Sequence, residues 1–375
     1  MLKTTPFHER TAALCASHAW RRWAGHIVAS SYELSHEREY HAIRSSAALF
    51  DVSPLYKYRV TGRDAAVLLD HVVTRSVRGM LVGQVGYTPW CDAAGKVLDD
   101  GTVARLKETE FRVTAAEPNL RWLQDNAGGL EVRVEDVSES IASLALQGPA
   151  SRLILDNVEL KYFRIVDTAY RGIPVQISRT GYTGDLGFEI WVEKSRALEL
   201  WDALIQAGMP YGIVPAGMLA LDVARIEAGL MLIDVDYVPA RKALIESQTS
   251  SPFELDLAWT VNLKKDRFVG RAALAAEAER GACSSSASRS NGNRSSGSTP
   301  RSGSPRACPP PPGARASPST PATSRRVTRR AAAGRRSSRN TSRSRTCARS
   351  GPRPARSSRS RSRSSTGASA PRRAL

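Results

Sequence analysis

The stretch RTGYTGDLGFEIWV, residues 179–192, decides the fold of its region. Its glycines recur every third residue, at Gly181, Gly184 and Gly187, and alternating apolar residues follow them. A phosphate-binding loop would need a Lys-Ser/Thr pair after its last glycine, and both that loop and a dinucleotide fingerprint lead into a helix. Here a strand follows the glycines. We therefore predict a tight turn between two strands, the second of which carries Glu189.

Glu189 lies among apolar neighbours on a strand that the sequence predicts to be largely buried. Carboxylates are rarely buried without a partner. One interpretation is a structural pair with a nearby cation such as Arg225. The other is that Glu189 accepts two parallel hydrogen bonds from adjacent N–H groups of a ligand such as a pterin. Tyr182, on the glycine-rich turn itself, would lie against such a planar ligand.

Strands and helices alternate on both sides of this stretch, which indicates the α+β class. Upstream we expect a helix over residues 34–49, a strand that ends in a Thr-Gly turn, a short helix, and several β-rich segments up to residue 149. Downstream, ALELWDALIQAG is an amphipathic helix with Gly208 placed as its C-terminal cap. Residues 215–229 form another helix with an apolar stripe, predicted at Leu219, Val223, Ile226 and Leu230.

Two adjacent carboxylates, Asp99 and Asp100, follow a turn in GKVLDDGTV. Successive strand residues face opposite ways, so both cannot point into one pocket unless the strand bulges. One of them is therefore expected to be structural or solvent-facing. Asp-Asp-Gly is also an ordinary turn signature, and the residues alone favour that interpretation.

Asp222 and Arg225 are three residues apart on a predicted helix and could form a surface ion pair, worth about 0.2–0.5 kcal/mol. Alternatively, the planar donor fork of Arg225 suits a carboxylated or pterin ligand. All six histidines lie at or before His71, without zinc-protease spacing, so we predict no metal site.

The charge of the chain is unevenly distributed. Residues 281–375 contain 22 of the 54 basic residues and no acidic one, so the body is mildly acidic although the whole chain carries +18. This Arg/Ser/Pro-rich tail cannot offset its ordering entropy and is predicted to be disordered. It could be a linker or an RNA-binding arm, but its composition and abrupt onset favour a frameshifted terminus. Nucleic acid is then expected only as a non-specific partner of the tail.

The cysteines and the hydropathy of the chain indicate its cellular compartment. Only Cys15 and Cys91 lie in the body, without framework spacing, which fits a reducing cytosol. No apolar run reaches signal-peptide or membrane-spanning length, so we expect a cytoplasmic protein without a membrane partner.

Taken in order, the motifs of residues 4–275 resemble the aminomethyltransferase family, which includes the glycine-cleavage T-protein and folate-dependent demethylases. The resemblance is found in these segments: TPFHERTAAL, HAIRSSAALFDVSPL, VTGRDAAVLL, Gly95–Asp100, SLALQGPAS, RTGYTGDLGFEI, LDVARIEAGL and DRFVGRAAL. It implies a multi-domain folate-binding catalytic region over residues 1–250. A C-terminal β-barrel domain would begin over residues 251–280, and the tail, residues 281–375, would replace most of it.

The resemblance also implies site residues and a reaction. Asp100 matches the family's catalytic aspartate, Tyr182 and Glu189 match pterin-binding residues, and Arg225 matches a ligand-contacting arginine. Tyr87 would help to wall the cavity against water. The implied cofactor is tetrahydrofolate, and the implied reaction moves an aminomethyl or methyl unit from a small donor, with a carrier protein as a further partner. A catalytically idle folate-binding protein and a folate-dependent demethylase are the alternatives.

Three departures from the family pattern border the implied substrate. Ser53-Pro54 replaces a Ser-His pair, Ala220-Leu221-Asp222 replaces Ala-Arg-Asp, and Ala116 stands nearest to a missing asparagine. These losses favour a less polar or methylated donor. We also expect the truncated barrel to leave apolar surface near Trp259 and Val261 uncovered, which would destabilise the chain.

Overall fold

The computed structural model describes residues 2–290, with side chains up to Gly281. All described residues belong to one unit, which clusters within Met1–Gly297. The tail, predicted to be disordered over residues 281–375, lies outside the described residues from residue 291 onward, whereas residues 281–290 form the end of a helix.

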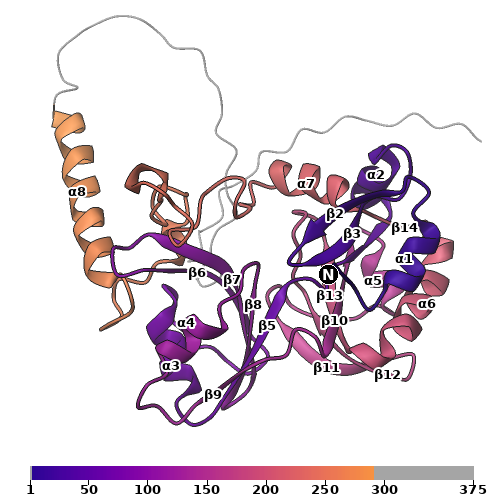
Figure 1. Cartoon of the computed structure of the whole chain (residues 1–375), viewed down its shortest axis with the longest axis horizontal. Helices are drawn as coiled ribbons and strands as arrows, with labels where there is room; N and C mark the ends of the chain where they lie inside the picture. The colour runs from indigo at the N-terminus through magenta and orange to yellow at the C-terminus, as the bar shows by residue number, and fades with distance from the viewer. Residues whose placement is uncertain (1, 291–375) are drawn as a thin grey trace, which may run out of the picture. The chain divides into compact units, whose positions relative to one another are not determined.

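Three sheets organise the described residues (Figure 1). The six-stranded sheet has the order β11 (Ile165–Tyr170), β12 (Ile173–Ser178), β13 (Gly187–Glu193), β10 (Ile141–Gln147), β4 (Ala47–Asp51) and β14 (Ile213–Pro215). The antiparallel five-stranded sheet has the order β6 (Val85–Cys91), β7 (Val97–Lys107), β8 (Glu110–Ala115), β5 (Tyr56–Thr61) and β9 (Arg133–Asp136). A small N-terminal sheet joins β1 (Lys3–Thr4), β3 (His26–Ser31) and β2 (Ala19–Trp23).

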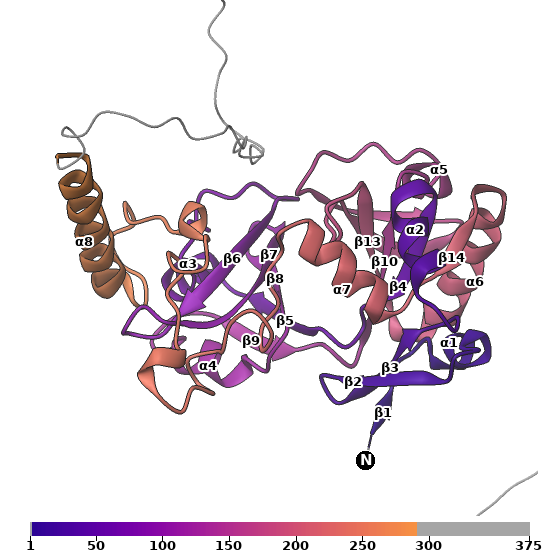
Figure 2. The same cartoon turned by 90° about the horizontal axis from the view of Figure 1, so that it is seen from above.

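Eight α-helices of the described residues accompany the sheets, and several of them cover faces of the two large sheets. They are α1 (His8–Leu14), α2 (Glu37–Ser45), α3 (Ala65–Val72), α4 (Leu120–Asp125), α5 (Ser151–Ile154), α6 (Ala197–Gly208), α7 (Met218–Glu227) and α8 (Arg271–Ser290). The six-stranded sheet packs α5 and α6 against one face and the adjacent pair α2 and α7 against the other (Figures 1 and 2). The five-stranded sheet buries one face against α3 and α4.

The strand period of two separates the apolar and polar faces of each sheet. In the six-stranded sheet, Leu144 and Ile190 point into the core beneath α6, where Trp201 is fully buried. In the five-stranded sheet, Val103 and Phe111 point into the core beneath α3. The intervening residues of the five-stranded sheet, among them Asp100 and Arg112, form its other face. In the six-stranded sheet the intervening residues include Phe50 and Ala145, which pack against α2 and α7, as well as Glu189 and Trp191.

Arg112 of β8 links the two large sheets. Its guanidinium lies 4.0 Å from the centroid of the Trp191 ring on β13 and donates to the Gln176 side chain on β12 at 2.5 Å. Arg112 pairs with Ala104, four residues along β7 from Asp100, so both side chains lie on one face of the five-stranded sheet. The fold thereby turns the surface with Asp100 toward the sheet that contains Glu189.

The mixed α+β class is confirmed, while several local predictions are wrong. The apolar stripe on α7 lies elsewhere: Leu219 and Ile226 are exposed, whereas Leu221 and the small Ala220 and Ala224 pack inward beside α2. Sequence periodicity also missed β2 and β3, whose strands are only half-buried.

The predictions for the cap at Gly208 and for a β-barrel also need correction. Gly208 is the last residue of α6 with φ −85°, so it is not a left-handed cap; the left-handed residue is Gly212 (φ 69°). Residues 251–280, predicted to begin a β-barrel, contain no strand; they form a 3₁₀ turn at Ala258–Thr260 and the start of α8, which runs past Gly281. Trp259 is 63% exposed, as expected for a surface without a barrel, whereas Val261 is half-buried.

No helix among the described residues is long and apolar enough to cross a membrane.

Candidate functional site

Asp99 and Asp100 face opposite sides of β7, in a continuous strand rather than in the turn that their signature favoured. Asp99 is fully buried and accepts hydrogen bonds from the side chain of Asn119 (2.6 Å) and the backbone N–H groups of Glu117 (3.1 Å) and Asp100 (2.8 Å). Burial and the neighbouring Asp100 raise the pKa of Asp99 to about 8. Asp99 is the structural carboxylate, and the half-buried Asp100 is the one available to a ligand.

Three tyrosines surround Asp100. Tyr237 donates its hydroxyl to Asp100 Oδ1 at 2.5 Å, and the nearby Tyr87 hydroxyl also favours the ionised form of Asp100. Tyr182 lies near enough that the Asp100 charge contributes to the raised pKa of its phenol, after burial. Burial raises the pKa of Asp100, and the hydroxyls of Tyr237 and Tyr87 oppose that shift. The structure thus groups three predicted site residues and adds Tyr237, which no sequence pattern singled out.

Trp259 extends this aromatic group. Its ring stacks on Tyr87 with centroids 5.9 Å apart, and the guanidinium of Arg75 lies 5.7 Å from the Trp259 centroid. The sequence interpretation treated Trp259 as uncovered core surface. The structure instead places it next to a predicted site residue.

Glu189 lies on β13, directly opposite Ser178 of β12 and Ala145 of β10. Thr180 donates its hydroxyl to Glu189 Oε2, and Arg112 is the charged group that stabilises its ionised form. Burial nevertheless raises the pKa of Glu189. Arg225, the example named for a structural partner, is bonded to Asp236 and not to Glu189, and the nearby cation is Arg112 instead.

Gly181, Gly184 and Gly187, the last of which begins β13, are explained by close contacts with neighbouring residues. Gln147 is fully buried at the end of β10, and a Cβ on Gly181 or Gly187 would lie 2.1 or 2.2 Å from its Oε1. Gln147 Oε1 accepts a hydrogen bond from the hydroxyl of Thr183 (3.0 Å). Gly184 has φ +76°, and its Cβ would lie 2.7 Å from Ala228. The motif is therefore a turn folded around one buried amide, which the spacing of the glycines did not reveal.

Arg225 is 4% exposed on α7 and binds Asp236 rather than Asp222. It also donates to the carbonyl of Leu230 at 3.2 Å, and its Nε is buried without a partner among the described residues. Asp222 instead accepts two hydrogen bonds from Arg21 of β2, each 2.9 Å long. The predicted pair within α7 is wrong because each residue finds a better partner on another element.

A second group of buried polar atoms lies where the two sheets meet. Arg112 Nε and Ser143 Oγ are buried without hydrogen-bond partners among the described residues. Burial lowers the pKa of Arg112 to about 10 and that of the fully buried Lys57 to about 7. Lys57 Nζ donates to the carbonyls of Ser53 (2.7 Å) and Leu55 (2.8 Å), so it ties down the loop that departs from the family pattern.

These residues fit a folate in part. Glu189 is half-buried, and only one of its oxygens accepts a hydrogen bond from the described residues, so the other could receive N–H groups of a pterin. The rings of Tyr87 and Tyr182 offer planar apolar surface. The hydroxyl of Tyr182 and one amino group of Arg225 are already bonded, to the carbonyl of Met231 and to Asp236. The residues described include no group of three or more His, Cys, Asp or Glu side chains that could bind a metal ion.

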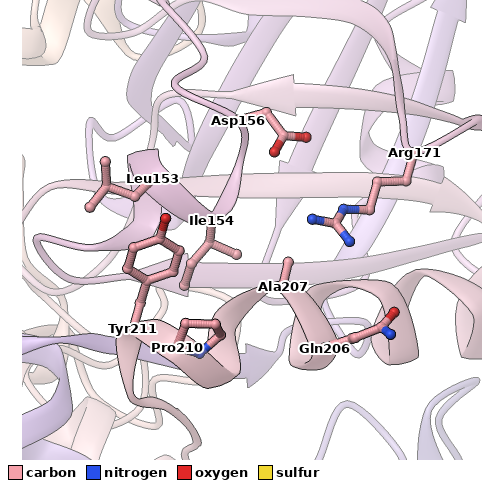
Figure 3. Close-up of a pocket in the computed structure, with 8 residues that line it drawn as sticks. All are labelled: Leu153, Ile154, Asp156, Arg171, Gln206, Ala207, Pro210 and Tyr211. Carbon is pink, nitrogen blue, oxygen red and sulfur yellow. The ribbon is translucent and has the colours of Figure 1, made fainter. Parts of the chain in front are cut away.

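Two surface pockets lie away from these residues. One, of about 340 Å³, lies between α5, the turn before β12 and the end of α6 (Figure 3); its lining includes Leu153, Asp156, Arg171, Gln206 and Tyr211. The other, of about 300 Å³, is lined by residues that include Val82, Leu106, Val166 and Gln176. Neither contains a predicted site residue.

Comparison with known proteins identifies the family of the chain. The GCVT N-terminal domain model matches residues 7–265. The solved structure of the glycine cleavage system aminomethyltransferase T from Bartonella henselae is similar, with a TM-score of 0.66 and 27% identity, over 75% of this chain and 76% of that one. An aminomethyltransferase of Thermoanaerobacter sp. is 35% identical over 65% of this chain and 67% of its own length.

The chain therefore belongs to the aminomethyltransferase family, whose aminomethyltransferase members are transferases. A further relative, the trimethylamine-oxide aldolase of Ruegeria pomeroyi, is 35% identical over 73% of this chain. The chain spans only 36% of that relative's length.

Proposed function

We propose that this chain moves a methyl or aminomethyl unit from a small donor to tetrahydrofolate, with Asp100 as the catalytic carboxylate. The observation that supports this most directly is the setting of Asp100, a half-buried carboxylate that accepts the hydroxyl of Tyr237 and is also stabilised by that of Tyr87. It lies on the sheet face that Arg112 turns toward the sheet containing Glu189. The family membership of the chain agrees with folate-dependent chemistry in general.

Each predicted residue has a defined task in this proposal. Bound tetrahydrofolate would supply the secondary amine nitrogen that accepts the carbon. Glu189 would orient the pterin through the oxygen that Thr180 leaves free, and Tyr87 and Tyr182 would pack against its ring system. Arg225 would act indirectly, by supporting the site residues, because its guanidinium already binds Asp236.

Asp100 would stabilise charge at the accepting nitrogen. When that nitrogen forms a bond to carbon with its lone pair, it bears positive charge until its proton leaves. The bond between carbon and the donor heteroatom breaks with its electrons on the heteroatom, which can take up the released proton, so no oxidant is needed. A fixed carboxylate that is partly shielded from water is well suited to stabilise that charge or to relay the proton.

A folate-dependent demethylase is the second candidate, and the aromatic surroundings of Asp100 favour it. Tyr87, Tyr182 and Tyr237 surround one carboxylate, and methylated ammonium groups pack well against aromatic faces. A relative of the chain is named as an aldolase of trimethylamine oxide, which is a methylated amine compound. The loop at Ser53-Pro54 also lacks the histidine of the family pattern.

Calorimetric titration of the full chain with tetrahydrofolate tests binding, and product analysis by mass spectrometry with methylated amines or aminomethyl donors tests turnover. Glu189→Gln should weaken folate binding about 10- to 100-fold, since a hydrogen bond to a charged group is lost. Glu193→Gln, at the exposed end of the same strand, is the matched control. Asp100→Asn should keep folate binding and abolish turnover.

Three results would discriminate among the alternatives. A wild-type chain that does not bind tetrahydrofolate would rule out the folate proposal. Folate binding without turnover of any donor would favour a catalytically idle folate-binding protein. Unchanged turnover in Asp100→Asn would remove Asp100 from the reaction.

A further inference from the structure

One short segment, residues 231–237, contacts three of the predicted site residues. The carbonyl of Met231 accepts the hydroxyl of Tyr182, and the carboxylate of Asp236 accepts from Arg225. Tyr237 donates to Asp100. These site residues come from three different parts of the chain: the glycine-rich turn, α7 and β7. The segment therefore joins them into one structure.

The segment is a tight turn fixed by its own hydrogen bonds. The backbone N–H of Asp234 donates to the carbonyl of Tyr237 and that of Asp236 donates to Leu232, each at 2.9 Å. Asp236 Oδ2 also accepts from the N–H of Leu232 at 2.7 Å. Ile233 and Tyr237 are 8% and 4% exposed and pack into the core beside β6 and β7. Such a turn presents the Tyr237 hydroxyl at a fixed position.

We propose that Tyr237 is a positioning residue for Asp100. The Tyr237 hydroxyl holds one carboxylate oxygen in place, favours the ionised form of Asp100 and leaves the other oxygen to the reacting nitrogen. The catalytic part of this inference rests on the proposed function. The coupling between Tyr237 and Asp100 does not, because it can be measured in the protein without ligand.

The groups that face Asp100 explain why a phenol is needed. They are Tyr87 on β6, Tyr182 on the glycine-rich turn, and Tyr237, while the charge of Asp99 acts on Asp100 from the opposite face of the same strand. No basic side chain of the described residues forms an ion pair with Asp100. The neutral tyrosine hydroxyls therefore offset part of the free-energy cost of burying the ionised Asp100 carboxylate. Burial and the Asp100 charge both raise the pKa of Tyr237, so this phenol stays protonated and acts as a donor.

Removing the hydroxyl has an effect that depends on pH. Burial already raises the pKa of Asp100 above its unfolded value, so ionised Asp100 destabilises the fold as pH rises. Tyr237→Phe keeps the buried ring but removes a donor to the carboxylate, which raises that pKa further. The melting-temperature deficit of Tyr237→Phe should therefore grow as pH rises through the range above about 4, the usual pKa of an unfolded Asp.

The experiment compares thermal melts of the full chain across this pH range in four proteins: wild type, Tyr237→Phe, Asp100→Asn and the double variant. The pH-dependent deficit should vanish in the Asp100→Asn background. Tyr170→Phe is the matched control, because the hydroxyl of Tyr170 is also buried but donates to a backbone carbonyl, that of Ile154, at 2.9 Å. Its deficit should not vary with pH. Tyr87→Phe should also produce a melting-temperature deficit that grows with pH, as Tyr237→Phe does.

Where turnover is measurable, the acid limb of the kcat/KM profile should move up by about one pH unit in Tyr237→Phe, with folate affinity at high pH unchanged. A deficit that is independent of pH, or that persists in the Asp100→Asn background, would overturn the inference. Absence of folate binding by the wild type would refute the proposed function but leave the melts decisive for Tyr237 and Asp100.

Discussion

Arg225 and Asp236 form a buried-to-surface ion pair that fastens the turn of residues 231–237 to α7. The side chain of Arg225 is 4% exposed and that of Asp236 31% exposed. The same Asp236 oxygen also closes the turn by accepting the N–H of Leu232. An arginine that family resemblance assigns to ligand binding is thus engaged by the protein itself, through the turn whose Tyr237 binds Asp100.

Arg225→Met should destabilise the chain by about 3 kcal/mol, because it removes a mostly buried partner of a carboxylate together with the bond to Leu230. Urea unfolding measures this change. Arg196→Met breaks a pair with Glu199 on the surface and should cost less than about 1 kcal/mol. Equal effects of the two substitutions would show that the buried pair has no special structural role.

Gly187→Ala should destabilise the chain by about 1–3 kcal/mol, since its Cβ would collide with the buried amide of Gln147. Displacing Gln147 would also disturb Thr180, whose carbonyl Gln147 contacts at 3.4 Å and whose hydroxyl binds Glu189. We therefore expect lower folate affinity as well as a lower melting temperature. Gly128→Ala, where a Cβ meets no atom within 4 Å, should leave both unchanged. A neutral Gly187→Ala would mean that Gln147 moves freely.

Lys57→Met should make stability less dependent on pH. Burial lowers the pKa of Lys57 to about 7, below its unfolded value, so the unfolded chain binds more protons between these values. Lys57 consequently destabilises the fold most below pH 7, and its penalty fades as pH rises toward about 10, by at most about 1.4 kcal/mol per pH unit.

Denaturant melts at several pH values check this. The stability of Lys57→Met relative to wild type should be highest near pH 6 and decline toward pH 9. The exposed Lys161→Met is the control and should show no such trend. A difference that stays constant with pH would mean that Lys57 is charged throughout this range.

The sequence by itself determined the α+β class, the strand that contains Glu189, the turn character of its glycines and the family. These features depend on local periodicity, on turn residues and on the order of motifs, all of which are written along the chain. The alternation of strand faces also indicated that only one of Asp99 and Asp100 could serve a ligand, but not which one. That choice depends on Asn119 and Glu117, which a later turn brings against Asp99.

Only the tertiary structure decided the partners. Arg225 lies three residues from Asp222, yet it binds Asp236, while Asp222 binds Arg21 from the far N-terminal sheet. Tyr237 carries no motif and becomes important solely because its turn packs against β7. Ion pairs and hydrogen bonds act over a few ångströms, and residues far apart along the chain come that close only after the sheets and helices have packed. No local pattern records this proximity.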